Sequence, residues 1–293
     1  MLGRIGIWSA VLDRVEVSQT RDLVAELDET GWHALWFGES TGRESMANSA
    51  MLLGASQRLV IGTGIASIYA RDPMAANGGS RLLAAQYPGR FVLGLGVSHR
   101  PLVEGGRHQT YGPPLQAMSA YLDAMDAVSS RSVEAAGPRA PRVLAALGPR
   151  MLELARDRAD GALPYLVTPD HTAGARQILG PDKTLAVEQS VVLTADRQVA
   201  LARGRDHLAQ YLPLPNYVRS WRRQGFTEDD LSGGGSDRLV NALVAWGEPD
   251  QIAAAVAEHL AAGADHVCVQ VVPTDDAPIP VAQWRALAPA LLG

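Results

Sequence analysis

The sequence contains very little cysteine, no excess of positive charge and no long apolar run. Cys268 is the only cysteine among 293 residues, which excludes an internal disulfide framework and any site built from several cysteines, such as an iron–sulfur cluster. Lysine and arginine number 26 against 31 aspartate and glutamate residues, a net charge of −5, so the clustered positive charge that binds nucleic acid is not expected. No apolar stretch approaches the roughly 18 residues that a membrane-spanning helix needs.

Three further absences bear on location and chemistry. The segment Met1–Trp8 lacks the charged-then-apolar run of a secretion signal, so we expect a cytoplasmic protein. There is no His-Glu-x-x-His motif and no pair of histidines at metal-ligand spacing, so no metal site is expected. The Gly-x-x-x-x-Gly-Lys phosphate loop is also missing.

Short β-type runs alternate with longer segments rich in alanine and leucine. The predicted strands are Arg4–Trp8, Ala34–Phe37, Leu59–Thr63, Phe91–Leu95, Val143–Leu147, Gly161–Pro164, Ala186–Leu193 and His266–Val272. The predicted helices are Val17–Thr30, Ala47–Gln57, Pro73–Gln86, Pro114–Ser129, Pro149–Arg158, Asp170–Ile178, Arg197–Gln210, Gln251–Ala262 and Pro280–Leu292. Strands separated by helices pair in parallel through crossovers.

Eight such units predict a single α/β domain over residues 1–293, a (β/α)8 TIM barrel with loop insertions at the C-terminal face of the strands. An open doubly wound sheet is the alternative. Its usual Gly-x-Gly-x-x-Gly after the first strand is replaced here by Trp8-Ser9-Ala10-Val11.

Two stretches interrupt the alternation, residues 98–113 and residues 211–237. The second contains two prolines, Trp221 and the run Gly233-Gly234-Gly235. Long irregular loops in a compact domain usually serve function. We therefore predict that residues 211–237 form a mobile cover over the site.

Barrel enzymes carry their sites at the C-terminal ends of the strands, which nominates Glu39 and His99 as catalytic residues. A buried Glu39 could act as an acid or base, or it could be a structural carboxylate that accepts backbone N–H bonds. His99 could move a proton, or it could be a solvated loop residue. The same rule nominates further strand-end residues: Trp8, Ser9, Glu188–Ser190 and Gln270.

The other histidines are less promising. His33, His207 and His259 fall on or beside predicted helices and are expected at the surface. His266 begins the last strand, at the wrong end of the barrel for catalysis.

Two glycine-containing strand ends could approach a ligand closely. Gly62-Thr63-Gly64-Ile65 would let the backbone approach a flat ligand, or would serve only packing. Gly148-Pro149-Arg150 precedes a helix whose free N–H groups could hold a phosphate, or it is an ordinary turn with proline at the first helical position.

Several segments resemble the luciferase-like flavin and deazaflavin oxidoreductases. They are the segments Gly31–Ser40, Leu59–Ile65 and Arg81–Gly96, and Gly148–Met151 together with Ala159–Gly161. The brevity of the chain and its Ala/Gly/Arg bias are similar to the branch that uses coenzyme F420, while FMN binds the same barrel mouth in sister families.

The resemblance implies a non-prolyl cis peptide near Gly64-Ile65, in a bulge that backs the cofactor ring. It also implies a set of cofactor contacts: Ser40, Gly64, Ile65, Ser67, Val97, Ser98, Gly148, Pro149, Arg150, Pro164 and Tyr165. A homodimer is expected as well, with the predicted helices 47–57 and 73–86 at its interface.

This chain departs from its relatives at the positions that handle protons. Dehydrogenases of the F420 branch carry histidine where this chain has Ser40, and glutamate where it has His99. Serine is a poor acid at neutral pH, so His99 or Glu39 would have to move the proton. The preferred function is hydride transfer between F420 and a small organic substrate. The alternatives are an FMN-dependent monooxygenase served by a partner reductase, and a barrel that binds cofactor without catalysis.

Overall fold

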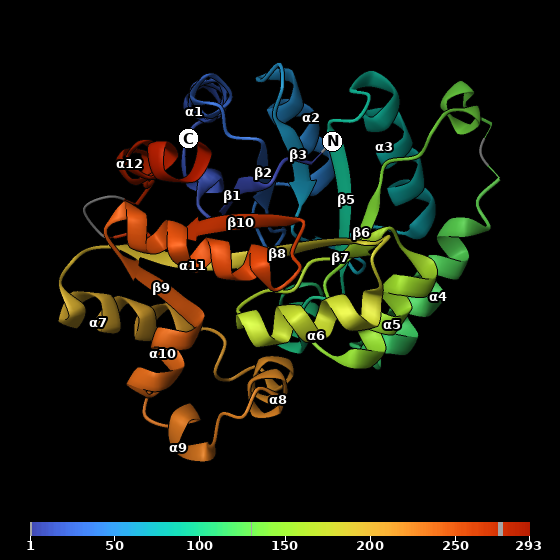
Figure 1. Cartoon of the computed structure of the whole chain (residues 1–293). Coiled ribbons are helices and arrows are strands. Elements are labelled where there is room, and N and C mark those ends of the chain that lie inside the picture. Colours follow the sequence, from blue (N-terminus) through green and yellow to red (C-terminus); the bar gives the residue numbers. More distant parts are fainter. Residues whose placement is uncertain (1, 130, 275–277) are drawn as a thin grey trace.

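The computed structural model describes residues 2–129, 131–274 and 278–293, and within them eight parallel strands close into a barrel (Figure 1). The strands are β1 (Ile5–Ser9), β2 (Ala34–Phe37), β3 (Val60–Thr63), β5 (Phe91–Gly96), β6 (Arg142–Leu144), β7 (Gly161–Ala162), β8 (Thr184–Leu193) and β10 (His266–Val271). Neighbouring strands pair in parallel, and β10 pairs with both β1 and β8, which closes the ring. The predicted (β/α)8 barrel is confirmed, and the open-sheet alternative is wrong.

The helices that surround the barrel match the predicted ones closely. They are α1 (Val17–Thr30), α2 (Ser45–Gly54), α3 (Pro73–Gln86), α4 (Pro114–Asp126), α5 (Pro149–Arg158), α6 (Pro169–Leu179), α7 (Arg197–Leu208), α11 (Pro249–Ala261) and α12 (Val281–Leu292). Local chemistry sets several ends. Asp72 caps α3 by accepting from the N–H groups of Met74 and Ala75, one residue before Pro73. Gly263, just beyond α11, takes a left-handed φ of 105°.

Two short strands were not predicted. β4 (Ala66–Ser67) pairs with β5 just beyond the end of β3. β9 (Val244–Gly247) pairs with the last residues of β8, Ser190–Leu193, beyond the part of β8 that pairs with β7. β9 directly follows a helix without a turn residue, so its sequence carries no boundary signal.

The barrel interior is filled by side chains from its strands and from the loops after them. This inner cluster comprises Trp8, Ala34, Trp36, Val60, Val92, Val143, Leu163, Ala186 and Cys268. At the N-terminal end of the barrel, the Trp36 indole donates to His266 Nε2 over 3.0 Å. His266 therefore lies at the end opposite the expected site, as predicted.

Two histidines predicted at the surface are instead buried, so that prediction was wrong. His207 is 6% exposed and His259 1% exposed. Each meets a polar side chain of β8. His207 Nε2 lies 3.0 Å from Ser190 Oγ, and His259 Nε2 lies 2.9 Å from Gln189 Oε1. Hydrogen bonds to these polar side chains of β8 allow both imidazole rings to be buried. The sequence pattern of a helix does not reveal such partners on a distant strand.

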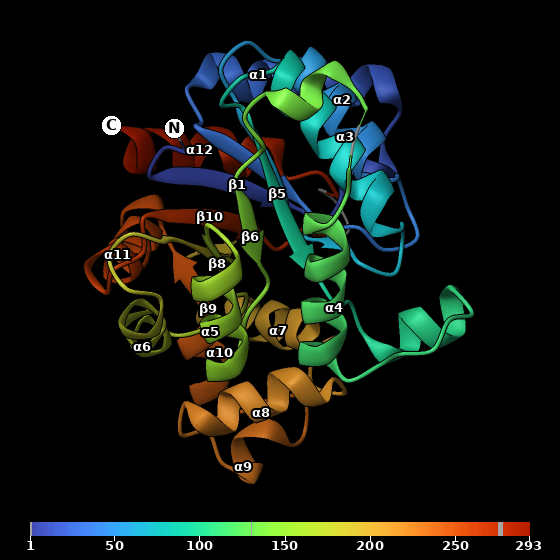
Figure 2. The same cartoon turned by 90° about the vertical axis from the view of Figure 1, so that its right-hand side faces the viewer.

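Residues 211–237 are helical rather than irregular. They contain α8 (Pro215–Arg223) and α9 (Glu228–Leu231), and α10 (Asp237–Leu243) begins at their end. Tyr217, Trp221 and Phe226 are buried in a second apolar cluster, separate from the main core of the barrel. In Figure 2, β5 points toward α8, so these helices lie at the C-terminal mouth of the barrel.

No helix among the described residues is long and apolar enough to cross a membrane.

Candidate active site

The loop after β3 forms a bulge at the barrel mouth, and its Gly64–Ile65 peptide bond is cis, as the resemblance implied. The bulge lies against Trp8, whose indole N–H donates to the Gly64 carbonyl over 3.0 Å. A Cβ on Gly64 would lie 2.7 Å from that indole nitrogen, so only glycine fits. On the other side, a Cβ on Gly96 would lie 2.4 Å from Cγ1 of Ile65. The half-exposed Ile65 side chain therefore lies over β5 at the mouth.

Glu39 follows β2 and holds this bulge in place. One of its carboxylate oxygens accepts from the Ser67 N–H over 2.9 Å, and the other accepts from the Ser45 N–H over 2.9 Å. The second oxygen also pairs with Arg71, and the two side chains are 3% and 8% exposed. These contacts tie the end of β2 to the segment that follows the bulge and to the start of α2. These contacts favour the structural alternative for Glu39, and its catalytic role stays a prediction.

Ser40 and its neighbours lie on the rim. Ser40 is exposed, and its carbonyl accepts from Arg107 Nη2 over 2.8 Å. The run Gly38–Gly42 has the Gly-x-Ser-x-Gly spacing of a serine nucleophile elbow. Ser40 is absent from the residues with positive φ and lies in a loop rather than at a sharp strand-to-helix turn. Hydrolysis by Ser40 therefore has no structural support.

After β5 the chain places Val97, Ser98 and His99 at the mouth. Ser98 takes a φ of 55°, and its carbonyl accepts from the Tyr111 hydroxyl over 3.3 Å. The His99 ring lies 5.8 Å from the ring of Tyr217 on α8. Burial lowers the pKa of His99, and a hydrogen bond to Asn216 opposes that shift. His99 is thus a neutral imidazole at pH 7, covered by α8.

The start of α5 forms a cradle beneath Arg223 of α8. The Leu147 carbonyl accepts from Arg223 Nη2 over 3.1 Å and from Ser220 Oγ over 3.3 Å. A Cβ on Gly148 would lie 3.2 Å from that arginine nitrogen. Pro149 starts the helix, and Arg150 is exposed in its first turn. Free N–H groups at a helix start and a guanidinium above them suit a phosphate or carboxylate.

Residues after β7 begin a chain of buried polar groups. Pro164 is buried, and the Tyr165 hydroxyl donates to Gln270 Oε1 over 2.7 Å. The Tyr211 hydroxyl lies 2.7 Å from that of Tyr165. The Trp8 and Tyr165 rings meet edge to face at 5.4 Å, which connects this chain to the bulge.

Glu188 forms a second buried polar group beside the first. It accepts from Ser190 Oγ over 2.7 Å and from the Leu166 N–H over 3.0 Å. Burial raises the pKa of Glu188 to about 7, against the two hydrogen bonds. Ser190 Oγ also lies 3.0 Å from His207 Nε2, so one hydroxyl joins a carboxyl to an imidazole.

Sequence reasoning nominated Glu188–Ser190 and Gln270 only as strand ends, and it missed Tyr211, Asn216, Tyr217 and Arg223. The arginine pair Arg222-Arg223 was the available signal for the last of these. Two other arginines near the mouth have ion-pair partners: Arg71 pairs with Glu39 and Glu44, and Arg100 pairs with Glu104.

Comparisons with known proteins agree on the family. The model of the luciferase-like monooxygenases matches residues 5–266. A protein of Mycobacterium tuberculosis named as a putative coenzyme F420-dependent oxidoreductase is 26% identical, over 83% of this chain and 87% of its own length.

Solved structures show the same fold at low identity. An F420-dependent secondary alcohol dehydrogenase in complex with an F420-acetone adduct has a TM-score of 0.77 at 13% identity, covering 99% of both chains. The oxygenating constituent of 3,6-diketocamphane monooxygenase from Pseudomonas putida, in complex with FMN, has a TM-score of 0.69 at 12% identity, covering 98% of this chain and 96% of that one.

Proposed function

Because the chain belongs to the luciferase-like monooxygenase family, a family of oxidoreductases, we propose that it is a coenzyme F420-dependent oxidoreductase that transfers hydride between the deazaflavin and a small organic substrate. The family includes users of both F420 and FMN. The residues of this chain favour the first.

The observation that carries the proposal is the set of arginines around the start of α5. Arg219 and Arg223 lie one turn apart on α8, and Arg150 lies in the first turn of α5. None of the three has an ion-pair partner among the residues that the structure describes. Both cofactors carry a phosphate, but the F420 tail carries additional carboxylates. Unpaired arginines beyond a phosphate cradle suit that longer anionic tail.

The residues at the mouth fit a flat ring as well. Glycine at position 64 lets the backbone approach closely, and Ile65 presents an apolar side chain. The bound cofactor supplies the hydride chemistry, and the protein supplies position and electrostatics. Ser98, which lies at the mouth with a left-handed φ, would contact the ring or its side chain, whereas Ser67 is fully buried.

We assign proton transfer to His99. Its pKa is lowered by burial, so the ring is neutral at working pH and can accept a proton from an alcohol as hydride leaves the carbon. Asn216 orients the ring through its hydrogen bond. In the reverse direction the protonated ring would donate to the carbonyl oxygen.

Titration with the two cofactors tests the proposal. We expect F420 to quench tryptophan fluorescence, because Trp8 lies against the bulge, and to bind at least about tenfold more tightly than FMN. Replacing both Arg219 and Arg223 with glutamine should remove most of that preference. A deazaflavin without phosphate and tail should be insensitive to the double substitution, which separates ring binding from tail binding.

Binding of FMN in preference to F420 would refute the proposal and favour the monooxygenase alternative. That alternative requires a reductase partner, so oxygen consumption with a supplied flavin reductase would be its own test.

A further inference from the structure

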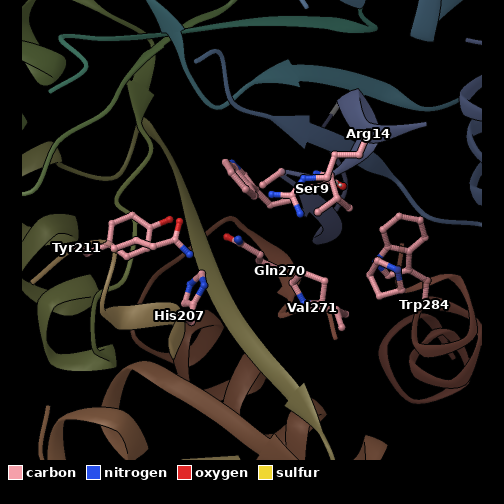
Figure 3. Close-up of a pocket in the computed structure, with 13 residues that line it drawn as sticks. Ser9, Arg14, His207, Tyr211, Gln270, Val271 and Trp284 are labelled. Atoms are coloured by element: carbon pink, nitrogen blue, oxygen red, sulfur yellow. Dashed lines mark hydrogen bonds between the residues drawn. The ribbon is translucent and has the colours of Figure 1, made fainter. Parts of the chain in front are cut away.

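A cavity of about 90 Å³ lies beside the bulge, at the edge of the barrel mouth. The ends of β1 and β10, the end of α7, and α12 form its walls, and Figure 3 shows Gln270 pointing into it between Ser9, His207 and Trp284. The Trp8 indole forms part of the wall and also donates to the Gly64 carbonyl. One indole ring therefore separates this cavity from the cis peptide.

The cavity carries a single positive charge. Arg14 lines it, is exposed, and has no ion-pair partner among the residues that the structure describes. Asp13, the residue before Arg14, does not neutralise it. The Asp13 Oδ2 accepts from the Arg43 N–H over 3.1 Å. His207 also lines the cavity, but burial lowers its pKa to about 4, so it is neutral at pH 7.

Hydrogen-bond donors converge on the same space. Gln270 is 5% exposed, and its side-chain carbonyl oxygen accepts from the Tyr165 hydroxyl. Its side-chain N–H groups therefore remain available to donate to a ligand. Ser9 is 4% exposed and its oxygen accepts from the Val11 N–H, so its hydroxyl proton is available. The buried Trp284 N–H has no hydrogen-bond partner in the described part of the chain. Buried donors without acceptors cost free energy until a ligand supplies one.

We propose that this cavity binds a small organic monocarboxylate. Arg14 pairs with the carboxylate, Gln270, Ser9 and the Trp284 N–H donate to it, and Trp8 and Val271 enclose the hydrocarbon part. One unpaired cation matches one negative charge, and the apolar side chains among the polar lining give a short hydrocarbon chain a contact that inorganic phosphate cannot use. The statement that this acid is the substrate rests on the proposed function. The binding of the acid does not depend on that function.

Calorimetry on the cofactor-free protein tests the inference with three probes: butyrate, its uncharged analogue butyramide, and inorganic phosphate. We expect butyrate to bind at least about tenfold more tightly than butyramide. Arg14→Gln should abolish that difference. Arg4→Gln is the matched control, because Arg4 is an exposed arginine at the opposite end of β1, and it should leave butyrate binding unchanged.

A second substitution keeps the test decisive if Arg14→Gln unfolds the protein. Gln270→Glu still accepts from Tyr165 but places a negative charge in the cavity, so it should weaken butyrate by about tenfold or more and spare butyramide. Equal binding of butyrate and butyramide, tighter binding of phosphate, or unchanged butyrate binding in both variants would overturn the inference. Because no cofactor is present, these outcomes are independent of whether F420 binds.

Discussion

Glu188 offers the sharpest test of the energetics of the barrel interior. Its side chain is buried, accepts two hydrogen bonds, and has no ion-pair partner among the described residues. Its pKa rises from an ordinary 4.5 to about 7 because burial disfavours the charged form. A raised carboxyl pKa means that the folded state binds the proton more tightly. Stability from this group is therefore complete below pH 4.5 and is lost as the pH rises through about 7.

The gap between the two pKa values, at about 1.4 kcal/mol per pH unit, corresponds to about 3 kcal/mol. Glu188→Gln removes the charge and keeps the shape. Its amide oxygen can still accept from the Leu166 N–H, and its amide can donate to Ser190 Oγ, whose own proton then turns to His207. The variant should therefore gain stability over wild type at alkaline pH and little at acid pH.

Urea unfolding at about pH 5 and about pH 8.5 measures this, and the stability difference between variant and wild type should grow by about 2.5 kcal/mol between them. The quantity to compare is the difference in unfolding free energy between variant and wild type. The buried His207, His259 and His266 change the stability of both proteins with pH in the opposite direction, and this contribution cancels in the difference. Burial lowers each pKa to about 4, so their stability is lost as the pH falls from 6.5 to about 4. Glu153→Gln, at an exposed position on α5, is the control. A difference that stays constant with pH would refute the assignment of an elevated pKa to Glu188.

Three further outcomes are expected. Glu39→Gln should destabilise the protein by about 3 kcal/mol in urea unfolding, because it leaves the buried Arg71 guanidinium with only the half-exposed carboxylate of Glu44. Glu44→Gln should cost far less, and equal losses would contradict the structural role of Glu39. His99→Ala and His99→Gln should each lower turnover at least about tenfold with cofactor affinity unchanged, and wild-type turnover in both would dismiss His99. Light scattering should report a homodimer that Leu82→Arg, at an exposed position of α3, converts to monomer; a monomeric wild type would end that prediction.

The fold could be read from the sequence because each unit carries its own local signals. α1, α3 and α5 have the predicted bounds, and at α3 the Asp72-Pro73 pair marks the start within two residues. Strands buried on both sides have apolar runs that need no long-range information. The bulge after β3 was implied only by the family resemblance, and the structure adds the reason for glycine at position 64, where a Cβ would lie 2.7 Å from the Trp8 indole nitrogen.

Residues 211–237 could not be read in the same way. Prolines and glycines suggested an irregular loop, yet Pro215 stands at the first position of α8, where proline is favoured. The helix has a strongly apolar side, with Tyr217 and Trp221 buried, but it is too short for periodicity to be decisive. Tyr217 and Trp221 are buried in one apolar cluster with Leu208 of α7 and Leu239 of α10, which no local pattern reports. Mobility of this segment stays a prediction, and protection from proteolysis by cofactor would test it.

The polar interior was hidden for a more general reason. The Tyr165 hydroxyl forms hydrogen bonds with Gln270, 105 residues away in the sequence, and with Tyr211, 46 residues away. Each of these residues alone is an unremarkable strand end or helix end. Only closure of the barrel brings them within 2.7 Å, and only burial turns Glu188 into a carboxyl that titrates near neutrality. The ends of all eight strands meet at the mouth of a barrel. Its chemistry therefore depends on which residues, far apart in the sequence, lie close together at the same level of the barrel. Local patterns place Gln270 near the end of a strand, and the closed ring determines what Gln270 can bind.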